Sequence, residues 1–200
     1  MADVKKPTVK ELVSQSPAEI QKFLGSVYEH SPWVAEAFTS NASASYASIE
    51  RVTDLAVALK EIVNASSSER KQALLNAHPD LCEKVEKLEK LTKESQEEQS
   101  RSGLQSLTAD EKERFSKFNT LYRERFGFPF ILAVRNATKY TVLAALQGRV
   151  DNSVEKELQI ALEQVHKIAW MRLLSKFDTS DAKGFLTCHV LDTANGCPGE

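Results

Sequence analysis

The sequence has few of the glycines and prolines that interrupt helices and few of the cysteines that cross-link small domains. It contains seven glycines, six prolines and three cysteines among 200 residues. The cysteines, Cys82, Cys188 and Cys197, are odd in number and widely spaced, which indicates reduced thiols in an intracellular protein. No apolar run is long enough to span a bilayer, and the first residues lack the apolar stretch of a secretory signal. The net charge of -2, without a basic arm, argues against nucleic-acid binding. We therefore expect neither a membrane nor a nucleic acid as partner.

Cofactor and metal motifs are also missing. The sequence contains no glycine-rich loop that could hold a phosphate and no nucleophile elbow. His78, Asp80 and Cys82 alternate as ligand types, but they share one turn and have no companion pair elsewhere, so they are a weak metal candidate. An enzyme built on this sequence is expected to use no cofactor and no metal, and to work by acid–base and electrostatic means.

Helical signals fill the chain up to Phe177. Ser16-Pro17 combines a capping serine with a proline at the first helical position. Apolar residues recur at spacings of three and four between residues 49 and 63, and Thr108 with Glu111 forms a capping box for a long helix that Gly127 can end. Further helices are expected over 138–149 and over 152–177, the last with Asn152 and Glu155 as a capping pair. The sequence predicts an all-α fold, a single compact multi-helix domain of about eight helices.

The chemistry centres on Asn76-Ala77-His78-Pro79-Asp80-Leu81. Pro79 keeps the residue before it out of the α conformation, so a helix that starts near Ser67 should end at about His78. The helix dipole at that end favours a protonated imidazole, and a histidine biased toward its acid form suits a proton donor. For this stretch alone, the commoner alternative is a surface histidine that only helps to end the helix.

Arg172 is the second unusual residue. It occupies the next position on an apolar stripe of the last predicted helix, formed by Leu158, Leu162, Val165 and Ala169. An arginine on such a stripe needs an anionic partner, because an unpaired buried charge is very costly. That partner is either a carboxylate of the protein, the commoner case, or an anionic substrate held by two parallel hydrogen bonds.

Two further stretches could bind a ligand. Thr92, Ser95, Glu98 and Gln99 fall on one helical face, where their hydroxyl, carboxylate and amide groups could bind a polar molecule. The alternative is an ordinary wet surface. In the stretch from Phe128 to Val134, a proline interrupts the helix and leaves backbone groups able to face a ligand. The alternative there is an aromatic plug that fills the core.

Five motifs together resemble one known family. They are His78-Pro79-Asp80-Leu81, Ser95-Gln96-Glu97-Glu98-Gln99, Phe118-Asn119-Thr120-Leu121-Tyr122, Phe126-Gly127-Phe128-Pro129-Phe130-Ile131 and Ile168-Ala169-Trp170-Met171-Arg172-Leu173. In this order and spacing, with twenty-one residues from His78 to Gln99, they are similar to the 2-oxo-4-hydroxy-4-carboxy-5-ureidoimidazoline (OHCU) decarboxylases of urate breakdown. The resemblance covers roughly residues 8 to 177.

The resemblance implies a carboxy-lyase that forms (S)-allantoin and CO2 without a cofactor or metal. It implies an all-helical homodimer, peroxisomal in many eukaryotic relatives and otherwise cytoplasmic. His78 matches the catalytic acid, and Glu98 would orient it or accept hydrogen bonds from the ureido group. The residues that match the family's substrate-binding positions are Pro79, Ser95, Gln99, Phe130, Ile131, Leu132, Ala133, Val134 and Arg172.

The tail resembles a second family. Residues 186–198 are similar to the opening strand of the transthyretin-like 5-hydroxyisourate hydrolases, with His189 at one of their active-site positions. The stretch is far too short for a β-sandwich. We therefore expect a decarboxylase domain over 1–177, a linker over 178–184 and the inactive, truncated start of a hydrolase domain over 185–200, as in a fused two-step protein.

The rival from another class is a helical interaction module without catalysis. In such a scaffold Arg172 should pair with a protein carboxylate and face no cavity. A helical redox or hydroperoxidase-type enzyme fits less well, because no two cysteines lie close together in the sequence.

Overall fold

A computed structural model describes residues 5–40, 46–80, 107–134 and 137–179, together with 191–192 and 197–198. Up to Phe177, the regular structure of the described residues is entirely helical, which confirms the predicted all-α fold class. The eight α-helices in these ranges are α1 (Val9–Val13), α2 (Pro17–Leu24), α3 (Trp33–Ser40), α4 (Val52–Ala65), α5 (Ser68–Asn76), α8 (Ala109–Phe126), α9 (Lys139–Arg149) and α10 (Val154–Lys176). A short 3-10 helix spans Tyr46–Ser48.

The helix boundaries follow capping chemistry. Capping boxes start three of the helices, each with a serine or threonine oxygen accepting the backbone N–H three residues on; they are those of Thr8, Ser16 and Thr108. Gly127 ends α8 in the left-handed conformation with φ 72°, and its N–H donates to the carbonyl of Arg123 at 2.9 Å. Both the capping box at Thr108 and the glycine stop were predicted and are confirmed.

One predicted cap is wrong. The oxygen of Ser153, not that of Asn152, accepts the backbone N–H of Lys156 at the start of α10. The Asn152 amide instead donates to Glu157 Oε2 at 2.7 Å. Serine and asparagine are almost equally good caps, and the Asn152 side chain is engaged by Glu157, five residues along the chain, which leaves Ser153 as the cap.

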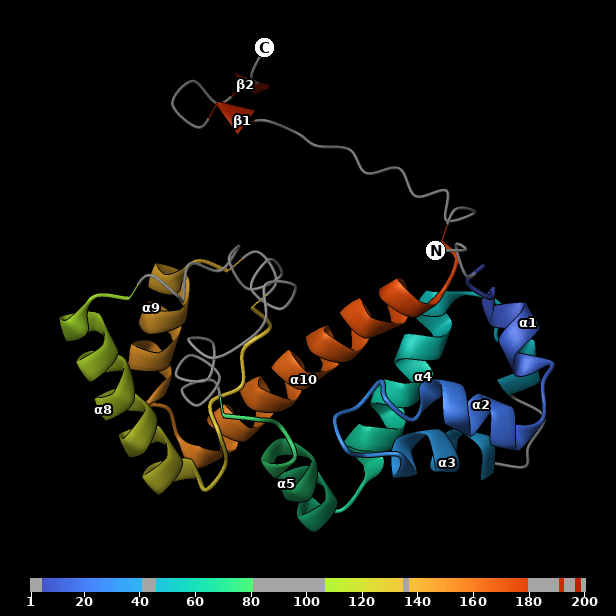
Figure 1. Ribbon diagram of the computed structural model, residues 1–200, viewed down its shortest axis with the longest axis horizontal. Helices are drawn as coiled ribbons and strands as arrows, with labels where there is room; N and C mark the ends of the chain where they lie inside the picture. Colours follow the sequence, from blue (N-terminus) through green and yellow to red (C-terminus); the bar gives the residue numbers. More distant parts are fainter. Residues whose placement is uncertain are drawn as a thin grey trace.

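Helix α10 organises the molecule. It runs across the whole helical body, with α8 and α9 near one end, α5 near its middle and α1 to α4 around the other end (Figure 1). Helices α4, α5 and α8 pack on it directly. The largest fully buried side chains of this core include Tyr122, Phe115, Phe128 and Phe130. Burial of the apolar side chains of this core is the main stabilising contribution to the fold.

The two ends of the helical body meet. The backbone N–H of Asp178, just after α10, donates to the carbonyl of Pro7, just before α1, at 3.0 Å. Farther along, β1 (Leu191–Asp192) pairs with β2 (Cys197–Pro198) in antiparallel register. In the parts of the chain described here, no helix is long and apolar enough to cross a membrane.

Candidate active site

His78 lies in the turn that follows α5. Its backbone N–H donates to the carbonyl of Leu75 at 3.2 Å, and its ring Nδ1 lies 2.9 Å from the carbonyl of Leu74. The residue is 7% exposed. Because a carbonyl only accepts, Nδ1 must carry a hydrogen. The proton that the imidazole gains or loses is therefore the one on Nε2.

Asp80 fixes this turn to α8. Its carboxylate accepts from Asn119 Nδ2 at 3.1 Å and from Arg123 Nη1 at 2.8 Å. Asp80 is 6% exposed, so its charge needs these partners. The sequence pattern indicated Asp80 only as a weak candidate metal ligand. In the described ranges no group of three metal-ligating side chains occurs, and Asp80 instead holds the His78-Pro79 turn in place.

Arg172 reaches back to the loop after α2. Its Nη1 donates to the carbonyls of Ser26 and Val27, both at 3.2 Å, and its Nη2 forms an ion pair with Glu29. The side chain is 33% exposed. A protein carboxylate is thus the partner of Arg172 here, which is what the non-catalytic alternative predicted.

Glu29 connects Arg172 electrostatically with His78. Burial raises the pKa of the Glu29 carboxyl, but the hydrogen bond and charge of Arg172, with the charges of His78 and His30, outweigh burial and lower the pKa overall. His78 and Arg172 therefore both favour the charged form of the same carboxylate.

The backbone from Phe130 to Val134 is held from the core side. Arg149 Nη1 donates to the carbonyl of Ile131 at 2.9 Å, and its guanidinium carbon lies 4.6 Å from the centre of the Phe130 ring. Gln164 Oε1 accepts the N–H of Ala133 at 3.2 Å. The phenylalanines do fill the core, as the aromatic-plug alternative stated, because Phe130 contacts the Tyr122 ring edge-on. A core function for these rings and a ligand function for the backbone are compatible.

A buried polar network supports this segment. Glu157 is 0% exposed and accepts from the hydroxyl of Tyr122, from Arg149 Nε at 2.8 Å and Nη2, and from Asn152. Burial raises the pKa of the Tyr122 hydroxyl, and the hydrogen bond to Glu157 raises it further. Sequence reasoning identified Arg172 as the arginine of the core and missed Arg149. Arg149 ends α9 and Glu157 lies in the first turns of α10, so no single helical stripe contains both.

Ser95, Glu98 and Gln99 lie outside the described residues, as does Cys82. Their expected position beside His78 therefore stays a prediction. Pro79 follows His78 directly and is exposed. Of the predicted substrate-binding backbone, Leu132, Ala133 and Val134 are half-buried.

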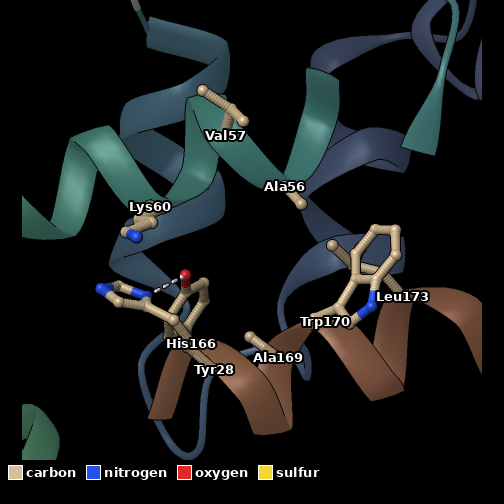
Figure 2. A pocket seen from close by; sticks show the side chains of 8 residues that line it. All are labelled: Tyr28, Ala56, Val57, Lys60, His166, Ala169, Trp170 and Leu173. Carbon is tan, nitrogen blue, oxygen red and sulfur yellow. Dashed lines mark hydrogen bonds between the residues drawn. The ribbon is translucent and has the colours of Figure 1, made fainter. Parts of the chain in front are cut away.

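A cavity of about 150 Å³ lies elsewhere, between α4 and α10 (Figure 2). It is lined by Tyr28, Lys60, His166 and Trp170, among others, and by none of the predicted site residues. Tyr28 and His166 lie together at one side of it, with the Tyr28 hydroxyl 3.0 Å from Nδ1 of His166. Burial, with a smaller contribution from the charge of Lys60, lowers the pKa of His166 to about 4. The ring is therefore neutral near pH 7.

Comparison with known proteins places the helical body in one family. The family profile described as OHCU decarboxylase matches residues 13–174. A relative named 2-oxo-4-hydroxy-4-carboxy-5-ureidoimidazoline decarboxylase, from Haloferax volcanii, is 41% identical over 155 residues, which are 78% of this chain and 87% of the relative.

Two longer proteins also match. A "Uric acid degradation bifunctional protein" from Bacillus sp. (strain TB-90) is 37% identical over 84% of this chain and 32% of its own length. A crystal structure of (S)-allantoin synthase is 60% identical with a TM-score of 0.77, and the match covers 96% of this chain and 62% of that one. This chain thus spans about a third of the first protein and less than two thirds of the second. From the matched residues and the identities together, the chain belongs to the OHCU decarboxylase family.

Proposed function

We propose that this chain is a carboxy-lyase that removes CO2 from 2-oxo-4-hydroxy-4-carboxy-5-ureidoimidazoline and releases (S)-allantoin, a step of urate degradation. The observation that carries the proposal is the family match over residues 13–174, which spans every predicted site residue. Relatives that match most of their own length bear the name of this decarboxylase. The family match outweighs the ion pair of Arg172, which a non-catalytic module would also show.

His78 is the proposed proton donor. Loss of CO2 leaves an electron pair on a ring carbon, delocalised into the adjacent imine and carbonyl. Because Nδ1 is held by the Leu74 carbonyl, an imidazolium at His78 delivers its proton from Nε2. The carbon that loses CO2 carries the hydroxyl and becomes a carbonyl of allantoin when that hydroxyl gives up its proton. The new C–H bond forms at the adjacent ureido-bearing carbon, and delivery of the proton to one face of that carbon sets the (S) configuration. The hydrogen bonds that hold Asp80 to α8 support this role, because they fix the turn that carries His78 and general acid catalysis requires a fixed donor position.

Arg172 is the proposed anchor for the substrate anion. Its hydrogen bonds to the Ser26 and Val27 carbonyls and to Glu29 use three of the five N–H donors of a guanidinium. The remaining two donors can take a carboxylate. Backbone amides of the segment from Phe130 to Val134 would hold the amide-rich ring, with Pro79 beside it. Ser95, Glu98 and Gln99 would complete the site, Glu98 by accepting from the ureido group or by orienting His78.

The test compares His78→Ala with the wild type on freshly generated substrate. Circular dichroism follows whether (S)-allantoin forms faster than the racemate. We expect the turnover of His78→Ala to fall by about two to four powers of ten while its far-ultraviolet spectrum stays that of the wild type, because general acid catalysis is worth that much. Asn76→Ala, an exposed position two residues earlier, is the matched control. Near-wild-type turnover in His78→Ala would remove the assignment.

We further propose that this domain works in a two-step protein with a transthyretin-like 5-hydroxyisourate hydrolase after a linker over 178–184. Support comes from the resemblance of residues 186–198 to that hydrolase and from the greater length of the allantoin synthase chain. A homodimer and a peroxisomal location, or else a cytoplasmic one, are also proposed from the family resemblance. Light scattering of the purified chain tests the dimer, since a mass of one chain at micromolar concentration contradicts it.

A further inference from the structure

The backbone from Phe130 to Val134 is anchored by two side chains from different helices. Arg149, the last residue of α9, donates to the Ile131 carbonyl at 2.9 Å. Gln164, near the middle of α10, accepts the Ala133 N–H at 3.2 Å. Ile131 and Ala133, two residues apart in the segment, thus each have one backbone polar group hydrogen-bonded to a side chain of the protein.

The Gln164 contact defines its own orientation. A backbone N–H can only donate, so the atom of the amide that faces it must be the oxygen. Gln164 is 9% exposed, and such a buried glutamine would be costly without a specific hydrogen bond. The side chain is therefore committed to the Ala133 amide, and that N–H is not open to a substrate.

The Arg149 contact is equally constrained. The guanidinium lies between the Phe130 ring, 4.6 Å from its centre, and the carboxylate of Glu157. Glu157 also accepts from Tyr122 and Asn152, so the arginine cannot rotate without leaving buried charges unpaired. The Ile131 carbonyl is consequently held at a fixed place relative to α9 and α10.

From these contacts we infer that Gln164 and Arg149 are positioning residues for substrate binding. They fix one polar group of Ile131 and one of Ala133, and so present the remaining amide groups of the segment to the amide-rich substrate. This inference rests on the proposed function. It assigns roles to two residues that do not touch substrate themselves and act through the peptide backbone.

Gln164 offers the cleaner test, because Arg149 variants leave Glu157 buried without its cation and can fail to fold. Gln164→Met keeps the length of the side chain and removes the acceptor. Gln159→Met, the same change at an exposed position of the same helix, is the matched control. Loss of one ordering hydrogen bond should raise KM by about tenfold, and kcat should stay within about twofold, because the segment binds ground state and transition state alike.

Hydrogen exchange supplies a structural readout. The Ala133 amide should exchange faster in Gln164→Met than in the wild type, and Gln159→Met should leave it unchanged. A Gln164→Met enzyme with the KM of the control, or one that loses kcat with KM unchanged, overturns the inference and leaves the proposed function standing. A wild-type chain that does not decarboxylate the ureidoimidazoline overturns the proposed function, and the inference falls with it.

Discussion

Glu157→Gln tests how far the buried network stabilises the fold. The carboxylate is fully buried and accepts from four donors on three side chains, those of Tyr122, Arg149 and Asn152. Glutamine keeps the shape of the side chain, removes the charge and turns one acceptor oxygen into a donor nitrogen. Whichever way the amide is oriented, at least one donor then faces another donor, and the guanidinium of Arg149 loses its counter-charge.

The expected loss follows from this geometry. Breaking a buried ion pair from one side costs about 3–5 kcal/mol, because a charge is left buried and uncompensated. With a urea m-value of about 2 kcal/mol per molar, that loss lowers the unfolding midpoint by roughly 2 M. Urea titration followed by circular dichroism at neutral pH measures it. Since a domain has only about 5–15 kcal/mol of stability, the variant should still fold but should unfold at a clearly lower urea concentration than the wild type.

Two comparisons make the result decisive. Glu163→Gln, an exposed position on the same helix, should move the midpoint by less than about 0.3 M. Arg149→Met combined with Glu157→Leu removes both charges, so the double variant should lose less stability than the two single changes added together. A Glu157→Gln midpoint equal to that of the Glu163→Gln control would refute the reasoning, because it would mean that the network contributes no net stability.

Three further results are expected. Asp80→Ala should lower kcat by about ten- to a hundredfold with a native circular dichroism spectrum, because it frees the His78 turn from α8. His166→Asn should lose less stability than the wild type between pH 7 and pH 5. The pKa of about 4 in the folded protein lies below the 6.5 of an ordinary histidine, so the unfolded chain takes up the proton first and wild-type stability falls as the pH drops through that range. Gly127→Ala should cost about 1–2 kcal/mol at φ 72°, whereas Gly148→Ala, with open space around the added carbon, should gain up to about 1 kcal/mol.

Each of these has a contrary outcome. An unchanged kcat in Asp80→Ala would show that the turn is held without the carboxylate. His30→Asn serves as control for the pH experiment, because His30 is exposed and asparagine tolerates its φ of 43°. Equal losses in the two histidine variants and the wild type would remove the linkage to His166. Equal melting temperatures for the two glycine variants would contradict the backbone argument.

Local signals predicted most of the fold. The capping box at Thr108, the serine–proline start of α2 and the glycine stop at Gly127 act within one helical turn, so the sequence alone reveals them. The His78 turn was predicted from one proline for the same reason, and α5 ends at Asn76, two residues before it. These features depend on neighbours along the chain and on little else.

The parts that sequence reasoning missed depend on contacts between distant residues. Glu29 is separated from Arg172 by 143 residues, and the Ala133 N–H from Gln164 by 31. The apolar stripe of α10 predicted that Arg172 needs an anion but could not say which one. Nothing in the pattern around Arg149 marked it as buried, because a basic residue in the last turn of a helix is also typical of an exposed end.

The contact between Pro7 and Asp178 brings the two ends of the helical body together. The chain enters and leaves this body at one place, so a short peptide could join residue 179 to residue 5 and new ends could be cut at an exposed turn. The same geometry allows the whole body to be inserted into a surface loop of a host protein, since the host needs to supply only two neighbouring attachment points.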